Sequence, residues 1–243
     1  MDLHVLVTRA RSVIAVTTLL ALAWPAAAQW SGKGEAGLAI ADGNTSTRTA
    51  NAKLALAWKV TDWEHDFGFE TLYVRNDGTT TARRWDASAQ SRYSFGGGDT
   101  FWFGGGRYEQ DRFSGFDHQG VVNTGIGHKF FDSDATKLSA QVGVGYKFWR
   151  TRTVPADSDR SVAGTAQVDF THQFTATTSL TNTFGAEIAS DNNFLQDQLA
   201  LAVKMSGRLA LSLAYAVRHN TDPPAGFRKT DRLSTVNLVY EVK

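Results

Sequence analysis

Apolar and polar side chains alternate along most of the chain from Trp30 onward. Residues 50–60, 137–148 and 209–217 are the clearest segments. In residues 137–148 the alternating apolar residues are Leu138, Ala140, Val142, Val144, Tyr146 and Phe148. A period of two puts apolar side chains on one face of an extended strand and polar ones on the other, which a helix of period 3.6 cannot do. The pattern therefore predicts strands with one apolar and one polar face.

Turn-forming residues divide these segments into about twelve strands. They are expected near residues 31–41, 47–60, 63–75, 82–95, 100–112, 119–131, 136–149, 160–173, 178–189, 194–204, 208–219 and 231–242. An even number of antiparallel strands places both chain ends on one side, as in single-chain bacterial barrels. We therefore predict an all-β fold, a closed antiparallel up-and-down transmembrane β-barrel.

The predicted connections alternate in character. Those after the second, fourth, eighth and tenth strands are tight, whereas those after the third, fifth, seventh and eleventh are longer or more polar. The longer set comprises residues 76–81, 113–118, 150–159 and 220–230. Outer-membrane barrels have short periplasmic turns and longer outside loops. The alternation thus predicts both termini in the periplasm.

The first residues have the features of a secretory signal peptide. Arg9 and Arg11 precede an almost wholly apolar run, residues 13–24, and three alanines follow at 26–28. This apolar run is shorter than the roughly 20 residues that a helix needs to cross a bilayer. The predicted organisation is a signal peptide, residues 1–28, and an outer-membrane barrel, residues 29–243.

The amino-acid composition argues against several classes of function. The 243-residue chain has no cysteine, so a thiolate nucleophile and a thiolate metal site are both excluded. A formal net charge of +1 with scattered basic residues does not favour nucleic-acid binding. The mean hydropathy of −0.27 argues against a helical membrane protein, but a barrel strand needs only one apolar face.

Charged residues of both signs fall on the polar face of the predicted strands. If the apolar face contacts lipid, they line the lumen, where unpaired charge is costly. We expect a structural ion-pair network that maintains the barrel shape, with a narrow water-filled path as the alternative. The predicted lumen-lining residues are Lys53, Glu70, Arg92, Arg107, Glu109, Lys147, Asp169, Glu187, Lys204 and Arg218.

Aromatic residues gather near the strand ends, as expected for girdles at the two lipid–water interfaces. The alternative is that they fill the core of a soluble β-protein. The predicted girdle consists of Trp30, Trp58, Trp63, Trp102 and Phe130 at one end and Tyr73, Trp85 and Phe148 at the other. Phe101 is expected beside the first group and Phe194 beside the second.

No residue is assigned to catalysis, to a metal or to a cofactor. The histidines after residue 28 are scattered, without metal-ligand spacing. Ser114 and His118 form the only local pair that could hydrolyse lipid at a barrel rim, but no third group or oxyanion hole accompanies them. The sequence therefore predicts a protein that is not an enzyme.

Several short motifs together resemble a known family. They are residues 30–37 (WSGKGEAG), 43–45 (GNT), 111–115 (DRFSG), 125–127 (GIG), 143–146 (GVGY) and 238–240 (LVY). In their order and spacing the sequence resembles the YdiY-like, salt-induced outer-membrane proteins, a family with a domain of unknown function. The resemblance implies an outer-membrane location and a link to salt or osmotic stress, and it implies no catalytic residue.

The predicted function is a structural or narrow small-solute channel protein of the outer membrane. A lipid-modifying enzyme and a soluble periplasmic barrel that binds an apolar ligand are the alternatives, and the latter would turn Leu54, Leu56, Val142 and Val144 inward. The expected partners are outer-membrane lipid, lipopolysaccharide and the assembly machinery, with no cofactor and no nucleic acid. The chain ends in Lys243 rather than in the aromatic residue that often closes such barrels. The oligomeric state does not follow from the sequence.

Overall fold

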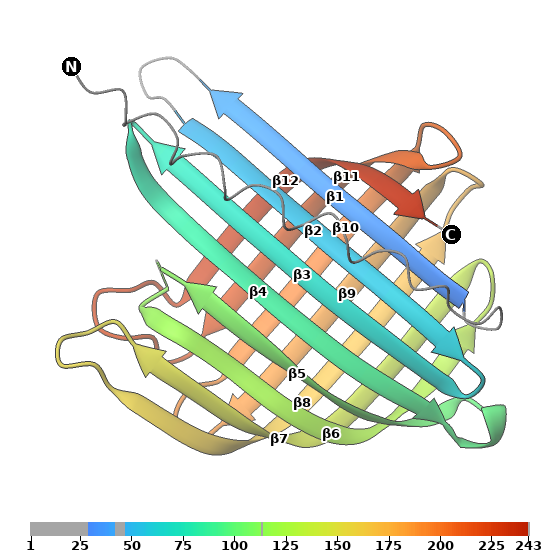
Figure 1. The fold of residues 1–243 in the computed structure, drawn as a ribbon, viewed down its shortest axis with the longest axis horizontal. Helices are drawn as coiled ribbons and strands as arrows, with labels where there is room; N and C mark the ends of the chain where they lie inside the picture. The colour runs from blue at the N-terminus through green and yellow to red at the C-terminus, as the bar shows by residue number, and fades with distance from the viewer. Residues whose placement is uncertain (1–28, 42–46, 113, 243) are drawn as a thin grey trace, which may run out of the picture.

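The chain folds into one closed antiparallel β-barrel, seen in a computed structural model that describes residues 29–41, 47–112 and 114–242 (Figure 1). The signal peptide predicted for residues 1–28 lies outside the described residues. Strands of the front and back walls cross steeply in Figure 1, because closure of a sheet requires its strands to tilt against the barrel axis.

All twelve predicted strands are confirmed, with ends that differ from the prediction by at most three residues. The strands are β1 (Gln29–Ala41), β2 (Thr47–Val60), β3 (Trp63–Asn76), β4 (Thr79–Ser94), β5 (Thr100–Asp111), β6 (Phe116–Asp132), β7 (Thr136–Thr151), β8 (Ser158–Gln173), β9 (Thr178–Ala189), β10 (Phe194–Lys204), β11 (Leu209–Asn220) and β12 (Thr230–Val242). The described residues include one short helical turn, η1 (Phe95–Gly97), and no helix long and apolar enough to cross a membrane.

Each strand pairs with its neighbours in the sequence, and β1 pairs with β12 to close the barrel. That closing ladder has five register pairs, from Gly32 opposite Val242 to Ala36 opposite Leu238. It is the shortest ladder among the described residues. The other ladder of β1, with β2, extends from Gln29 to Ala41. The start of β1 and the end of β12 therefore lie at the same end of the barrel, as predicted (Figure 1).

The two ends of the barrel differ in their connections. The end that holds Gln29 and Val242 carries the turns at 61–62, 95–99, 133–135, 174–177 and 205–208, and we call it the short-turn end. The opposite, long-loop end carries the two longest described connections, residues 152–157 and 221–229.

One predicted loop is wrong. Residues 76–81 were expected to form a longer polar connection, but β3 and β4 meet in a two-residue turn at Asp77 and Gly78. Both have positive φ, 45° and 80°. An Asp-Gly pair with this backbone matches the twist of the flanking strands, so it allows both strands to continue to the turn.

The apolar face of the barrel points outward. Leu54, Leu56, Val142 and Val144 keep 36–63% of their surface exposed, and their neighbours in each strand are more buried. This arrangement contradicts the soluble alternative, which requires these four side chains inside.

Two phenylalanines from β5 are exceptions to the polar interior. Phe101 and Phe103 point inward and each keeps only 1% of its surface exposed, so the prediction that Phe101 belongs to the outer girdle is wrong. Their rings lie over inward-facing glycines of β6 and β7: a Cβ built on Gly125 or Gly143 would meet the Phe103 ring at 2.9 or 3.0 Å. These glycines thus make room for the rings.

We predict that Gly125→Ala lowers the free energy of unfolding by roughly 1–3 kcal/mol, because the new methyl group would displace the Phe103 ring and the backbone of β7. Gly185→Ala is the matched control, since it also faces inward and its Cβ would meet nothing within 4 Å. Urea unfolding of the barrel in lipid vesicles measures both variants. Equal losses would show that Phe103 does not require the glycine.

Candidate functional site

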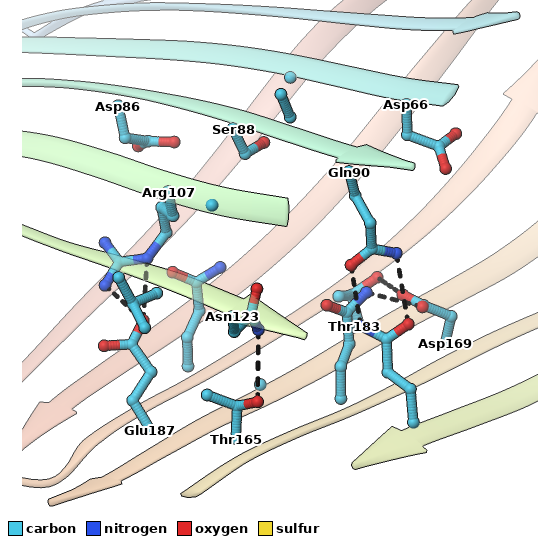
Figure 2. A pocket seen from close by; sticks show the side chains of 18 of the residues that line it. Asp66, Asp86, Ser88, Gln90, Arg107, Asn123, Thr165, Asp169, Thr183 and Glu187 are labelled. Atoms are coloured by element: carbon cyan, nitrogen blue, oxygen red, sulfur yellow. Dashed lines mark hydrogen bonds and ion pairs between the residues drawn. The ribbon is translucent and has the colours of Figure 1, made fainter. Parts of the chain in front are cut away.

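The lumen holds a cavity of about 410 Å³ between the two ends of the barrel (Figure 2). Most of the residues that line it are polar or charged, as the inward alternation of the strands requires. Among the lining side chains five are acidic and three are basic: Asp66, Glu70, Asp86, Asp169 and Glu187, and Lys53, Arg92 and Arg107. Amides and hydroxyls complete the polar wall, including Ser88, Gln90, Asn123, Gln141, Thr165, Gln167, Thr183, Gln196 and Gln198.

Hydrogen bonds join opposite walls of the lumen. Gln90 of β4 and Gln141 of β7 donate to each other, at 2.9 and 3.3 Å (Figure 2). The Lys53 ammonium of β2 donates to the Gln198 amide oxygen of β10 at 2.8 Å. These strands are not neighbours in the sheet, so the side chains bridge the space that an open pore would leave empty.

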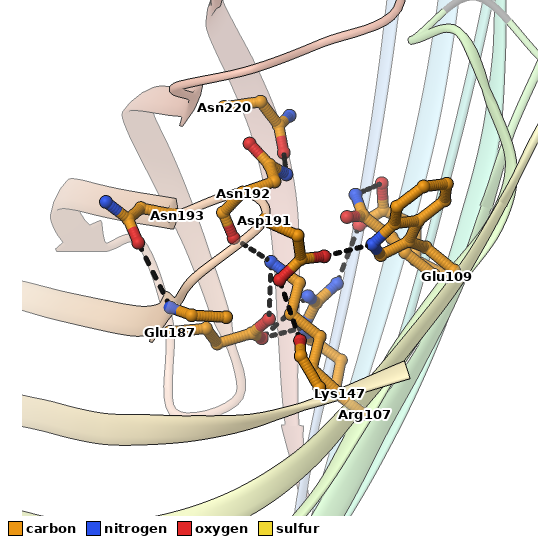
Figure 3. A network of polar contacts seen from close by, with 12 residues as sticks. Arg107, Glu109, Lys147, Glu187, Asp191, Asn192, Asn193 and Asn220 are labelled. Atoms are coloured by element: carbon orange, nitrogen blue, oxygen red, sulfur yellow. Dashed lines mark hydrogen bonds and ion pairs between the residues drawn. The ribbon is translucent and has the colours of Figure 1, made fainter. Parts of the chain in front are cut away.

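A compact group of five charged side chains closes the lumen on the long-loop side of the cavity, and we call it the charge layer. Figure 3 labels four of its members, Arg107 and Glu109 of β5, Lys147 of β7 and Glu187 of β9. The fifth is Arg218 of β11, which pairs with Glu109.

Arg107 contacts Glu109 at 2.8 Å and Glu187 at 2.7 Å, and Arg218 pairs with Glu109 from the opposite wall. No side chain of the layer is more than 16% exposed. Buried charges of this kind are tolerated only when each has a partner.

Phe194 packs against the two arginines of the charge layer. It is 3% exposed, and the guanidinium groups of Arg107 and Arg218 lie 4.5 and 5.0 Å from its ring centre. Aromatic faces attract cations, most strongly away from water. The prediction that Phe194 belongs to the outer girdle is therefore wrong, because the first residue of β10 points into the lumen.

The β9–β10 loop covers the charge layer from above. Lys147 Nζ donates to the backbone oxygen of Asn192 at 2.8 Å, and the Asn192 amide donates to Asn220 at 2.9 Å (Figure 3). Partial burial raises the pKa of the Asp191 carboxyl, but hydrogen bonds from the Trp149 indole and the Ser161 hydroxyl outweigh it and lower that pKa. The loop is thus fixed to the rim of the barrel by polar contacts.

All ten predicted lumen residues face inward, and the structure brings five of them together in the charge layer. The other five are more widely spaced. Glu70 pairs with Lys53, Arg92 pairs with Asp66, and Lys204 lies 3.9 Å from Glu241 near the short-turn end. Asp169 accepts hydrogen bonds from Gln167 and Thr183 and has no basic partner among the described residues.

Sequence reasoning missed the uncharged members of the lumen. Gln90, Gln119 and Gln141 occupy the same inward positions as the predicted charges, and Gln119 donates to Glu109 at 3.2 Å. Their signal is the same alternation, since they too fall on the polar face of their strands, but the predicted lumen set contains charged residues only.

The eight predicted girdle residues all lie on the outward face. Trp30 stacks on Trp58 with ring centres 5.6 Å apart near the short-turn end. Trp85 and Phe148 each contact Tyr108 toward the long-loop end, at 5.4 and 6.4 Å. The remaining girdle residues, with 38–57% of their surface exposed, are Trp63, Tyr73, Trp102 and Phe130.

Ser114 and His118 are not joined in the described contacts. The Ser114 hydroxyl donates to the backbone oxygen of Asp111, whereas His118 stacks on Tyr108 and lies 3.5 Å from Asp117. The part of the chain that the structure describes contains no group of three His, Asp or Glu side chains that could hold a metal. The contacts of the site are those of a polar, bridged lumen.

A family profile described as "Protein of unknown function, DUF481" matches residues 34–242. The chain belongs to this family. The Escherichia coli K12 protein YdiY, described as uncharacterized, is 26% identical over 226 residues, which cover 90% of this chain and 86% of YdiY. The YdiY-like resemblance seen in the sequence is thereby confirmed.

Solved structures resemble this DUF481 protein in fold. The NanC porin matches 88% of this chain and 100% of its own, with a TM-score of 0.53 and 9% identity. The translocator domain of the autotransporter NalP from Neisseria meningitidis matches 90% of this chain and 89% of its own, with a TM-score of 0.46 and 12% identity. At such identities the likeness concerns the fold alone.

We predict that Glu109→Ala lowers the free energy of unfolding by about 3–5 kcal/mol, because it leaves Arg218 buried without its carboxylate. Glu64→Ala is the control. Its partner Lys59 is 55% exposed, so the expected loss is about 0–1 kcal/mol. The double variant Glu109→Leu with Arg218→Leu should recover most of the loss. Chemical unfolding in lipid vesicles measures the free energy of unfolding of each variant. Similar losses for Glu109→Ala and Glu64→Ala would contradict a stabilising role of the charge layer.

Proposed function

We propose that this DUF481 protein is an outer-membrane barrel that forms a narrow conduit for small polar solutes, closed in the described conformation by the charge layer. The observation that carries the proposal is the polar cavity of about 410 Å³ inside a barrel whose outer face is apolar. The charge layer and the β9–β10 loop above it separate this cavity from the long-loop end. The link to salt or osmotic stress stays a prediction, which transcript levels in low and high salt would test.

The outer surface supports a location in a membrane. A closed ladder satisfies the backbone of every strand internally, which is the requirement for crossing hydrocarbon. The outward aromatic side chains toward both ends suit the two interfaces between lipid and water.

Arginines at the long-loop end support the orientation of the barrel. Six exposed arginines lie on outward strand positions there, and we call them the arginine rim: Arg48, Arg75, Arg83, Arg150, Arg160 and Arg232. Arg48 and Arg75 stand directly opposite each other across β2 and β3, an arrangement that is unfavourable unless anions neutralise it. Lipopolysaccharide phosphates of the outer leaflet would supply these anions, since guanidinium groups bind phosphate well. The long-loop end then faces the outside.

The lumen supports passage of small solutes rather than large ones. The cavity is many times larger than the ~30 Å³ that a water molecule occupies in the liquid. Acidic side chains outnumber basic ones in its wall, and Asp169 has hydrogen-bond donors but no basic partner among the described residues. A conduit of this composition favours cations over anions.

We predict that removing Glu109 and Arg218 opens the lumen. In planar bilayers the wild-type barrel should carry little current, and the double variant Glu109→Ala with Arg218→Ala should carry a several-fold larger, cation-preferring current. Adding Asp169→Asn to that variant should reduce the preference for cations. Reversal potentials in a salt gradient measure the preference.

Asp117→Ala with Arg152→Ala is the matched control, because it removes an ion pair of 2.8 Å at the long-loop end outside the charge layer. Its current should equal that of the wild type. A gel that compares unheated with boiled samples shows whether each variant is a folded barrel. Folded barrels without current in the wild type and in both variants would indicate a purely structural protein and would refute the conduit.

We further predict that lipopolysaccharide stabilises the barrel through the arginine rim. Arg75→Gln with Arg83→Gln should reduce the rise in unfolding temperature that added lipopolysaccharide causes. Arg152→Gln, whose charge is already paired with Asp117, should leave that rise unchanged. An undiminished rise in the double variant would argue against the proposed orientation.

A further inference from the structure

The outward side of β9, β10 and β11 differs from the rest of the barrel wall, and we call it the β9–β11 face. The chain contains no tryptophan after Trp149, and the only arginine within these three strands, Arg218, points inward into the charge layer. The outward tryptophans lie on β1 to β5 and the rim arginines on β2, β3, β4, β7, β8 and β12, so among the described strands β9, β10 and β11 form the one run of adjacent strands that has neither. Two features that suit the lipid interface are missing from the same three strands.

The β9–β11 face also carries a hydrogen-bonded polar pair surrounded by apolar side chains. Asn182 of β9 donates to the Asp197 carboxylate of β10 at 2.8 Å. Asp197 faces outward, because its register partners are Phe184 and Val217 and its chain neighbours Gln196 and Gln198 line the lumen cavity. The outward residues around the pair are Leu180, Phe184, Leu195, Leu199 and Val217.

A carboxylate among these residues is costly if acyl chains cover it. Ionisable side chains on the lipid face of a barrel destabilise it most near the middle of the membrane. Within membranes such residues usually face protein or water, where they find partners. Asp197 Oδ1 accepts from Asn182, while Oδ2 accepts no hydrogen bond from the described residues. One carboxylate oxygen of Asp197 is therefore left without a hydrogen-bond donor on this face.

A donor of the right kind lies on the same face. Tyr215 of β11 points outward, is 42% exposed, and its hydroxyl makes no hydrogen bond within the described part of the chain. Its register partner Leu199 is only two residues from Asp197 along β10. The face thus holds an unmatched acceptor and an unmatched donor close together.

We propose that the β9–β11 face is a symmetric interface between two copies of this chain in the outer membrane, in which Tyr215 of each copy donates to Asp197 of the other. The inference rests on the proposed membrane location. Two copies inserted in the same direction keep equal groups at equal depth, so a twofold axis along the membrane normal brings such a face onto itself. The contact removes Asp197 from lipid, and the strands that retain the tryptophans and the rim arginines stay in contact with lipid.

Cross-linking tests the interface directly, since the chain has no cysteine of its own. Leu199→Cys and Leu213→Cys place single thiols on the β9–β11 face, and Val142→Cys places one on β7, at a site of similar exposure. With an added oxidant in native membranes, at least one of the first two should yield a covalent dimer, and Val142→Cys should yield none. Cross-linking of Val142→Cys to the same extent, or of no variant, would overturn the proposal.

Sedimentation of the detergent-solubilised full-length protein gives a second measurement. The wild type should sediment as two barrels, and Tyr215→Phe should weaken the dimer about tenfold or more while the barrel stays folded. Asp197→Leu distinguishes contact with lipid from contact with a second copy. If Asp197 faces lipid, the substitution would stabilise the barrel and leave the mass of the sedimenting particle unchanged. If Asp197 lies at the interface, the variant should sediment as a monomer. A wild-type monomer would refute the interface.

The same samples distinguish this inference from the proposed function. Protein absent from the outer-membrane fraction would refute the location on which both depend. Folded barrels in that fraction that neither cross-link nor sediment as dimers would refute the interface alone. The conductance experiment is independent of both outcomes, because the charge layer lies inside each barrel.

Discussion

The closed ladder of backbone hydrogen bonds permits the two faces of this barrel to meet different surroundings. Twelve strands pair in sequence order and β1 meets β12, so no strand has a wholly unpaired edge. Once the backbone is satisfied within the sheet, side chains alone decide what each face contacts. Leu54 and Val144 on the outside, and Lys53 and Gln141 on the inside, follow from this separation.

Inside the barrel, pairing of charges opposes the opening of a pore. Each buried ion in the charge layer would be costly alone, and the layer pairs its members by joining β5, β7, β9 and β11 across the lumen. The contacts that hold these walls together also fill the passage between them. The cavity next to the layer persists because its amides and hydroxyls hydrogen-bond without filling the same volume.

The strands were predictable because alternation records the two faces directly, residue by residue. The same rule failed at Phe101, since Phe101, Trp102 and Phe103 are consecutive aromatics and alternation alone does not tell which of them turns inward. Their cross-strand partners decide this: Gly127 and Gly125 oppose Phe101 and Phe103, and only glycines leave room for the rings.

The meeting of Glu109 with Arg218 was not predictable from sequence. Their shared inward orientation follows from alternation, but 109 residues separate them along the chain. Contact across the lumen depends on how far the strands tilt and slide relative to one another, and no local pattern encodes that shift. The contact of Phe194 with the guanidinium groups of Arg107 and Arg218 depends on the same shift.

The short ladder between β1 and β12 has a consequence for how the molecule is made. Its two strands are the first and the last described along the chain, so their union brings together the most distant segments and carries the largest entropy of ring closure. Until it forms, the curled sheet has two bare edges, each a template for a foreign strand. During assembly these two edges must be kept from pairing with other chains until the five residue pairs between β1 and β12 have formed. The same pairs are the first site at which a strand of another chain could pair with the barrel.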